Sequence, residues 1–365
     1  GRWLFVATER KSEDRGQIGK MPKYVTESGY EEFEDVRTRV GRADPQPQAL
    51  WLADVATGKL RELKFDPLPG IDVDPLAALR KAAGKEPLKG HRAVQVATSG
   101  DNGDAPSLLW TGDGRTAAVM VRAIDNKDRW IATVDTAAGA LRPRHRLHDA
   151  AWINWGFNDF GWLGDDRTLW YLSEESGWSH LYTLEGERRT QLTDGRWETS
   201  QVVPARDGSR FYFACNRARP IDYEVCSVPA GGGEVRELTA LDGVENFALS
   251  PDGSRLLVRH SAAYLPPQLS VVDAGGGPAR QLTDTRSAAF KARLTHVNIN
   301  YRYKAEEVFY IFDDSDAQTV VYGSEFRDII VELKDRLTKV ATFIEVNEDG
   351  SAAPFAENYE KIVTG

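Results

Sequence analysis

The sequence predicts a mainly β protein: an incomplete β-propeller of about five four-stranded blades, followed by a small α/β segment of βαβαβ order. One unit recurs four times between Trp110 and Asp284. Its anchor arginines are Arg115, Arg167, Arg210 and Arg255, spaced 52, 43 and 45 residues apart. A period of this length, with several short strands per unit, is typical of propeller blades. All ten Trp lie at or before Trp197, and the final 80 residues hold only three Gly, which indicates a change of architecture near residue 290.

The last repeat unit shows how each blade is expected to form. Ser250-Pro251-Asp252-Gly253 has the residue preferences of a type I turn. Leu256 and Val258 then alternate with Leu257 and Arg259, as in a strand with one buried face. The strand QLSVVDA and a short strand at 280–284 complete the unit. The alternative, a β-sandwich of independent hairpins, does not explain the equal spacing.

A fifth unit is predicted upstream, split by an insertion. The segment GRWLFVATER at the start of the chain has the pattern of a strand that pairs with QALWLADVATGKLRELKF. About five blades therefore precede the change in composition.

The residues after Asp284 have a different pattern. Strands are predicted in VNINYRY, AQTVVYG and KVATFIEVN, and helices in KAEEVFYIFDDSD and SEFRDIIVELKDRL, the second with Ser324 as a plausible N-cap. This alternation predicts parallel βαβ packing. The predicted domains are 1–290 and 293–365.

Composition excludes several classes of function. A net charge of -9 argues against nucleic-acid binding, which needs a basic surface. No apolar run reaches the roughly eighteen residues of a membrane span. The chain has six scattered His and no Cys-x-x-Cys motif, so we expect no metal site and no cofactor. No compartment is predicted.

The two cysteines, Cys215 and Cys226, flank a predicted hairpin turn. We expect two reduced, half-buried thiols, because free Cys behaves as a small hydrophobe. A cross-strand disulfide is the alternative.

The segments YLSEESGWSHLYTLEG and QLTDGRWE, from Tyr171 to Glu198, resemble the propeller blades of the prolyl oligopeptidase family of serine peptidases, in its dipeptidyl peptidase IV branch. The resemblance covers residues 1 to about 290. It implies a propeller that sits over an α/β-hydrolase domain and admits short peptides but not folded proteins. The expected function is this substrate gating in proteolysis, with short peptides as partners when a hydrolase domain is supplied. A propeller that acts alone as a peptide- or protein-binding module is the alternative.

No catalytic residue is predicted. The nucleophile of such peptidases lies in a G-x-S-x-G elbow. The only G-x-S here, Gly177-Trp178-Ser179, continues with His180 and Leu181 inside a repeat unit. We therefore expect the chain to be inactive by itself.

The insertion near residue 30 supplies the only substrate-binding candidates, Glu31 and Glu32. They resemble the glutamate pair with which dipeptidyl peptidase IV relatives hold a substrate's free amine. The alternative is that this acidic insertion is simply solvated.

The stretch from Val297 to Tyr303 and the segment DDSDAQTVVYGSEF resemble the N-terminal subdomain of AMP-forming fatty acyl-CoA synthetases. Two partial families thus meet near Ala292, and we expect a truncated or chimeric chain, with a remnant of a fatty acyl-CoA ligase as a further alternative. Exposed blade faces are expected to cause self-association.

Overall fold

The computed structural model describes residues 1–10, 19–36, 46–96, 108–263, 265–286, 297–347 and 349–364. The chain divides into two compact units, Gly1–Thr285 and Arg286–Gly365. The first unit consists mostly of antiparallel sheets and the second is a small α/β arrangement. The mainly β fold predicted from the sequence is confirmed.

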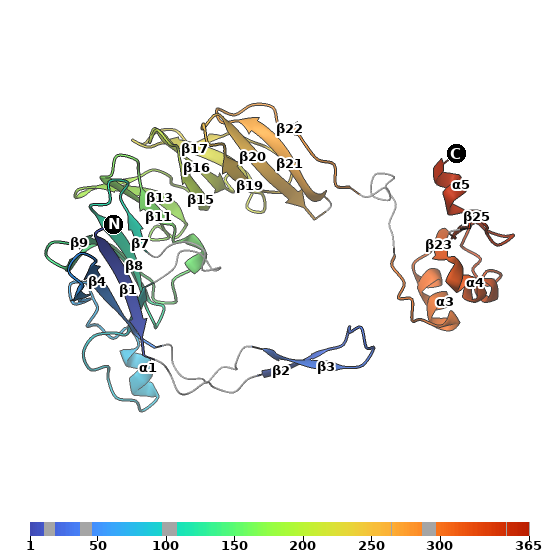
Figure 1. Cartoon of the computed structure of the whole chain (residues 1–365), viewed down its shortest axis with the longest axis horizontal. Coiled ribbons are helices and arrows are strands. Elements are labelled where there is room, and N and C mark those ends of the chain that lie inside the picture. Colours follow the sequence, from blue (N-terminus) through green and yellow to red (C-terminus); the bar gives the residue numbers. More distant parts are fainter. Residues whose placement is uncertain are drawn as a thin grey trace. The chain divides into compact units, whose positions relative to one another are not determined.

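The first unit contains five successive sheets, called here sheet 1 to sheet 5, whose strands follow chain order from blue to orange in Figure 1. Sheet 1 comprises β1 (Trp3–Glu9), β4 (Gln48–Asp54) and β5 (Lys59–Leu63). Sheet 2 comprises β6 (Val94–Val96), β7 (Leu108–Trp110), β8 (Ala117–Ala123), β9 (Asp128–Asp135) and β10 (Ala140–His148). Sheet 3 comprises β11 (Phe160–Trp162), β12 (Thr168–Ser173), β13 (His180–Glu185) and β14 (Arg188–Gln191). Sheet 4 comprises β15 (Thr199–Pro204), β16 (Arg210–Cys215), β17 (Glu224–Pro229) and β18 (Arg236–Glu237). Sheet 5 comprises β19 (Val244–Leu249), β20 (Arg255–Ala262), β21 (Leu265–Asp273) and β22 (Arg280–Gln281).

Sheets 3 to 5 have the predicted four strands in simple chain order. In sheet 2, β6 and β7 pair with the two ends of β8, so together they take the place of one inner strand. Sheet 1 has three strands, and β1 pairs with β4 along its whole length, from Trp3 opposite Asp54 to Glu9 opposite Gln48. The prediction that these two segments form one unit across the insertion is therefore correct. A short helix, α1 (Ala77–Ala82), lies between sheets 1 and 2 in the sequence.

Each pair of neighbouring sheets shares a hydrophobic core. Representative buried pairs from the successive cores are Leu50 with Trp130, Met120 with Tyr171, Leu172 with Phe213, and Tyr212 with Val258. None of the hydrophobic clusters among the described residues joins sheet 5 to sheet 1. The five blades thus form a row held together by four interfaces.

The inner strands are buried on both faces. In β12, Leu169 and Tyr171 enter the core shared with sheet 2, whereas Trp170 and Leu172 enter the core shared with sheet 4. The one-sided alternation predicted from the last repeat holds for the two terminal blades, where β20 in sheet 5 and β4 in sheet 1 bury every second residue. The difference arises because, among the described residues, sheets 1 and 5 each share a hydrophobic core with one neighbouring sheet only.

A threonine closes the outer edge of three blades in the same way. In sheet 3, the backbone N–H of Leu192 donates to the Leu181 carbonyl over 2.8 Å, and the Leu181 N–H donates to the Thr193 hydroxyl over 2.9 Å. Thr239 accepts from the Val225 N–H at 2.8 Å in sheet 4, and Thr283 accepts from the Leu269 N–H at 2.9 Å in sheet 5. The recurring Leu-Thr pair in the sequence therefore continues the strand ladder with a side chain where the outer strand stops.

Aspartates hold the tight turns that precede β8, β12, β16 and β20. Asp113, Asp165, Asp207 and Asp252 each accept a hydrogen bond from a backbone N–H of their own turn. In the Ser250–Gly253 turn, the Gly253 N–H donates to the Ser250 carbonyl over 2.8 Å, as a type I turn requires. Hydrogen bonds from Ser250 and Ser254 lower the pKa of Asp252 to about 2.

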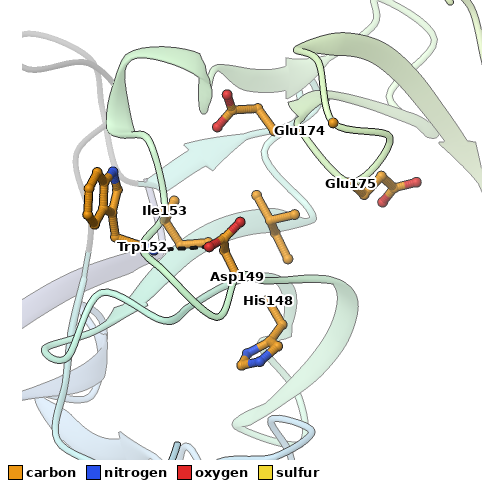
Figure 2. A pocket seen from close by; sticks show the side chains of 8 residues that line it. His148, Asp149, Trp152, Ile153, Glu174 and Glu175 are labelled. Atoms are coloured by element: carbon orange, nitrogen blue, oxygen red, sulfur yellow. Dashed lines mark hydrogen bonds between the residues drawn. The ribbon is translucent and has the colours of Figure 1, made fainter. Parts of the chain in front are cut away.

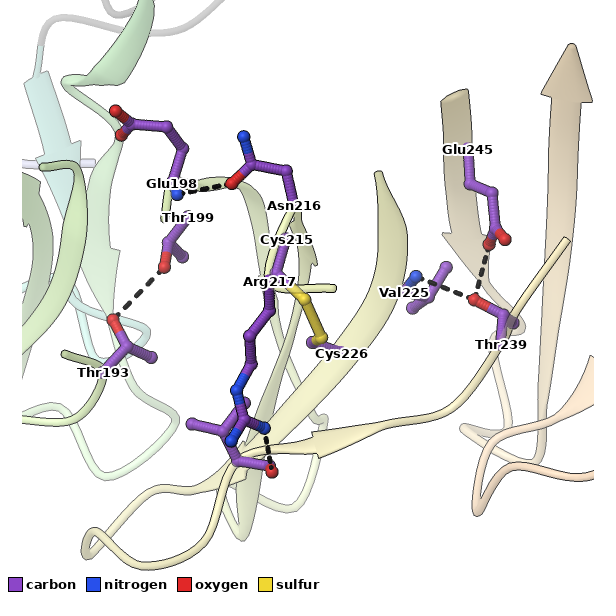
Figure 3. Close-up of a disulfide and its surroundings, with 11 residues drawn as sticks. Thr193, Glu198, Thr199, Cys215, Asn216, Arg217, Val225, Cys226, Thr239 and Glu245 are labelled. Carbon is purple, nitrogen blue, oxygen red and sulfur yellow. Dashed lines mark hydrogen bonds between the residues drawn. A yellow bond between two sulfur atoms is a disulfide. The ribbon is translucent and has the colours of Figure 1, made fainter. Parts of the chain in front are cut away.

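Cys215 and Cys226 form a disulfide between β16 and β17 (Figure 3). The expectation of free thiols was wrong. Both cysteines are fully buried in the core between sheets 3 and 4, as small hydrophobes would be. However, they also lie on the same face of adjacent strands, one diagonal step apart, with 6.1 Å between their Cα atoms. This separation is within the range that a disulfide spans.

The insertion in sheet 1 carries a two-stranded hairpin, β2 (Gly19–Lys23) with β3 (Glu32–Val36) (Figure 1). Its large apolar side chains are exposed, including Val25 at 91% and Phe33 at 62%.

The second unit contains α3 (Ala305–Asp314), β23 (Thr319–Gly323), α4 (Arg327–Leu333), β24 (Thr342–Val346), β25 (Glu357–Asn358) and α5 (Tyr359–Thr364). Its three strands form a parallel sheet in the order β23-β24-β25. The buried carboxylate of Glu345 accepts from the Tyr322 hydroxyl at 2.8 Å, from Arg327 and from the Ala353 N–H. Hydrogen bonding to Arg327 lowers the pKa of this carboxyl group.

Two local predictions in the second unit were wrong. Residues 297–303 form no strand, because Asn300 forms a turn in which its side chain accepts from the Arg302 N–H and its carbonyl accepts from the Tyr303 N–H. The third strand is instead 357–358. Ser324 lies in a 3-10 turn before α4 and caps nothing with its side chain.

A buried carboxyl group lies where sheets 4 and 5 meet. Glu245 is 1% exposed and accepts from the Thr239 hydroxyl at 2.5 Å and from the Leu241 N–H at 2.8 Å. Burial raises its pKa from 4.5 to about 7, and the nearby carboxylate of Glu224 adds to the rise against these two hydrogen bonds.

We predict that Phe213→Ala lowers the free energy of unfolding by about 3 to 5 kcal/mol, because it leaves a cavity in the core between sheets 3 and 4. Urea denaturation measures this change. Phe33→Ala is the matched control, since Phe33 is 62% exposed on the hairpin, and it should change stability little. Equal effects of the two substitutions would contradict the core assignment.

Glu245 should make stability depend on pH. The pKa of Glu245 is higher in the folded chain than in the unfolded chain, so protonation of its carboxyl group stabilises the fold. This stabilisation is complete below pH 4.5 and is lost as the pH rises through about 7. We expect the free energy of unfolding of the wild type, measured by urea denaturation, to decrease from pH 5 to pH 8. The decrease should be at most about 1.4 kcal/mol per pH unit. Glu245→Gln should remove this dependence, whereas Glu237→Gln, on the exposed strand β18, should leave it unchanged. A Glu245→Gln variant that keeps the wild-type pH dependence would rule out this role.

Candidate functional site

A pocket of about 250 Å³ opens where sheets 2 and 3 meet. Its walls come from two segments, the end of β10 with the connection after it, and the turn between β12 and β13. The lining residues are Leu147, His148, Asp149, Trp152, Ile153, Glu174, Glu175 and Gly177 (Figure 2). None of them is a serine, threonine or cysteine, so the pocket wall offers carboxylates and an aromatic ring but no hydroxyl or thiol nucleophile.

The carboxylate of Asp149 shapes one wall. It accepts from the backbone N–H of Ala151 at 2.6 Å and from that of Trp152 at 3.0 Å, the second of which is drawn in Figure 2, and the connection thereby folds into a tight turn. The turn is anchored to sheet 2 by the Ile153 N–H, which donates to the Asn126 carbonyl. The Trp152 side chain is left 70% exposed at the rim.

The two glutamates of the opposite wall have different environments. Their carboxylates point in opposite directions in Figure 2. Glu175 accepts from His145 Nε2 at 2.8 Å and pairs with Arg189, and these contacts outweigh the cost of burial and lower its pKa. The pKa of Glu174 is raised, first by burial and then by the carboxylate of Glu198. Glu175 is therefore held within the fold, whereas Glu174 is the more available carboxylate.

Arg129 is fully buried between sheets 2 and 3 and helps to position this wall through hydrogen bonds. Its guanidinium donates to Asn158 Oδ1 and to the Leu172 carbonyl, each at 2.8 Å, and lies 3.3 Å from His145 Nδ1. Burial lowers the pKa of Arg129 to about 10 and that of His145 to about 4. His145 is thus neutral at pH 7, and because Arg129 must donate, Nδ1 accepts and Nε2 donates to Glu175.

A second ionic cluster fixes the His148 side. The buried Asp128 accepts from Arg92 Nη1 at 2.6 Å and from Arg146 Nε at 2.7 Å, and its other contact is His148 Nδ1 at 3.1 Å. Burial alone would raise the pKa of Asp128, but these hydrogen bonds outweigh it and lower the pKa. Hydrogen bonds and ion pairs thus hold both walls of the pocket in place. The carboxylates that line it make the pocket negatively charged.

The predicted substrate-binding pair lies elsewhere. Glu31 precedes β3 and Glu32 begins it, both are exposed, and neither lines the pocket. The Glu32 carboxylate accepts from the Ser28 hydroxyl at 2.8 Å. Sequence reasoning did not identify His148, Asp149 or Trp152. The signal in the sequence was the connection after β10, which contains two Trp and is longer than the connections between later blades.

The one G-x-S in the chain is structural. Ser179 is fully buried, and its hydroxyl donates to the Thr199 carbonyl over 2.7 Å. His180 contacts the Thr193 hydroxyl and the Gly195 carbonyl, and not Ser179. Ser179 thus connects sheet 3 to sheet 4, and His180 holds the connection between them.

Among the residues that the structure describes, no group of three or more His, Cys, Asp and Glu side chains could hold a metal ion. The helices within this part of the chain are too short or too polar to cross a membrane.

Comparison with known proteins identifies the repeat. Residues 88–267 match the family model of the dipeptidyl peptidase IV N-terminal region. The fold is similar to dipeptidyl peptidase 4 of Porphyromonas gingivalis, with a TM-score of 0.54 and 18% identity over 80% of this chain and 37% of that one. A Bacteroides ovatus protein assigned as a dipeptidyl aminopeptidase IV gives a TM-score of 0.52 and 15% identity over 78% of this chain and 38% of its own. The predicted resemblance of the repeat to the dipeptidyl peptidase IV propeller is confirmed.

A curated relative of another kind is the 3-oxocholest-4-en-26-oate–CoA ligase of Rhodococcus rhodochrous, 35% identical over 69 residues, which are 19% of this chain and 12% of the ligase. The chain therefore spans about an eighth of the ligase and less than two fifths of either peptidase structure.

Proposed function

We propose that the five-sheet unit is the peptide-recognising, substrate-gating part of a dipeptidyl peptidase IV-like serine peptidase. The match of residues 88–267 to the N-terminal region of that family supports a role next to a peptidase. The observation that carries the proposal is the pocket between sheets 2 and 3, with the carboxylates of Asp149 and Glu174 beside the exposed ring of Trp152.

The chemistry of this pocket favours a cationic group. A peptide's free α-amine would meet two carboxylates in a partly desolvated site, where charge-assisted hydrogen bonds are strongest. The Trp152 ring adds a face on which a cation or an apolar first residue can lie. Because the side walls are fixed by Arg129 and Asp128, little ordering would be needed on binding. Recognition in this pocket, rather than at Glu31 and Glu32, is thus the proposed basis of gating.

We expect a short fluorescent peptide with a free N-terminus to bind the full chain more tightly than its N-acetylated form. Glu174→Gln should weaken binding of the free peptide about tenfold and leave binding of the acetylated peptide unchanged, since one charged hydrogen bond is lost. Fluorescence anisotropy measures both affinities. Glu185→Gln is the matched control, because Glu185 is an exposed glutamate at the other end of β13. Equal affinity for both peptides would refute the proposed recognition.

We also expect the full chain not to react covalently with a fluorophosphonate probe, because the Ser179 hydroxyl is buried and already hydrogen-bonded. In-gel fluorescence after labelling measures this, with a trypsin-like serine peptidase as positive control. Labelling that disappears in Ser179→Ala would show a nucleophile where we propose none.

A further inference from the structure

The candidate pocket contains two carboxylates that have no cationic partner among the described residues. Asp149 and Glu174 line it from opposite walls (Figure 2). The ion pairs that the described residues form around the pocket involve Glu175 and Asp128 instead. A ligand that enters the pocket therefore meets two separate negative charges, of which the α-amine of a peptide can neutralise only one.

The cations nearest to these carboxylates are used for other contacts. Lys127 donates from its ammonium group to the carbonyls of Ala150, at 2.7 Å, and Ala151. Arg129 gives its hydrogen bonds to neutral acceptors. Both cations thus hold backbone and neutral side chains of the walls, and the charge of the pocket is left for a ligand.

Asp149 combines a fixed position with an oxygen that the turn does not use. The N–H groups of Ala151 and Trp152 both donate to Oδ1, so Oδ2 is not needed to hold the turn. The Trp152 ring belongs to the same turn and is 70% exposed. A guanidinium group is the cation that both pairs with a carboxylate and stacks on an aromatic face.

The size and lining of the pocket favour one polar residue. Its volume of about 250 Å³ is below the roughly 300 Å³ at which pockets for whole small ligands begin, so it accepts one residue of a peptide. The apolar side chains in its wall, Leu147 and Ile153, are only 5% and 3% exposed. An apolar first residue would therefore find little apolar surface besides the Trp152 ring.

We propose that the pocket selects peptides whose first residue is basic, and arginine above all. This inference rests on the proposed function, in which Glu174 binds the α-amine of the peptide. Asp149 Oδ2 then accepts from the guanidinium group of the same residue, and the Trp152 ring lies against its face. Lysine should bind less tightly, because its ammonium group is a compact charge that does not stack on a ring.

A pair of C-terminally labelled peptides tests the choice of the first residue. Arg-Ala-Ala-Ala and citrulline-Ala-Ala-Ala have first residues of the same shape, and only the first has a charged side chain. We expect the full chain to bind the arginine peptide about tenfold more tightly in fluorescence anisotropy, because one charge-assisted hydrogen bond is gained. Asp149→Asn should make the two affinities equal, whereas Glu174→Gln should weaken both and leave their ratio unchanged.

Asparagine at 149 keeps an oxygen for the two N–H groups of the turn, so the variant should retain the wild-type melting temperature. Asp135→Asn is the matched control. Asp135 accepts from the Ala137 and Ala138 N–H groups in the same way and does not line the pocket, so this variant should keep the arginine preference. A citrulline-first peptide with arginine at its fourth position should bind like the plain citrulline peptide, although its charge equals that of the arginine peptide.

The outcomes separate this inference from the proposed function. Equal affinity for the arginine and citrulline peptides, with free peptides still preferred over N-acetylated ones, overturns the inference and leaves the proposed function standing. An arginine preference that survives Asp149→Asn, or that the fourth-position arginine reproduces, also overturns it. Equal affinity for free and N-acetylated peptides contradicts the proposed function instead.

Discussion

Packing of each inner sheet against two neighbours is the constraint on which the rest of the first unit depends. Tyr171 and Leu172 are adjacent in β12, yet their side chains belong to different cores. A shift of one residue in register would exchange the two sets of side chains, so both interfaces fix the same register. The turn aspartates and the edge threonines act within this frame, because they satisfy backbone groups where the buried strands begin and end.

The candidate pocket follows from the same packing. Arg129 is buried in the interface between sheets 2 and 3. It donates there to three neutral acceptors, Asn158 Oδ1, His145 Nδ1 and the Leu172 carbonyl. It thereby orders His145, and through it Glu175, on the opposite wall from Asp149. The connection 149–159 has room to form a rim because it is longer than the connections 192–198 and 238–243. Binding residues therefore come from a loop whose ends are fixed by the most rigid part of the sheets.

Local sequence patterns were enough to predict the blades, and long-range geometry was needed for the site. The repeat period, the Ser250–Gly253 turn and the pairing of β1 with β4 depend on spacing and alternation that can be read along the chain. The pocket joins His148–Ile153 to Glu174–Gly177, segments that belong to different repeat units and meet only after the sheets pack. The disulfide was ranked below free thiols for a related reason, since the residue type of Cys215 and Cys226 carries no information on their diagonal register. The strand expected at 297–303 does not form because the Asn300 side chain accepts the Arg302 N–H within a local turn.

The threonine that closes each outer edge has a consequence for how such a chain can change over time. Thr193, Thr239 and Thr283 accept from backbone N–H groups of their own repeat unit, so these N–H groups need no acceptor from the next unit, although the Thr239 hydroxyl itself donates to Glu245 of the next blade. Loss or duplication of one whole unit of forty-odd residues would orphan none of these backbone groups and would bring together two faces of the same kind as before. Blade number can therefore vary between descendants by in-frame steps of one unit, while changes of a few residues inside a unit are opposed by both of its cores.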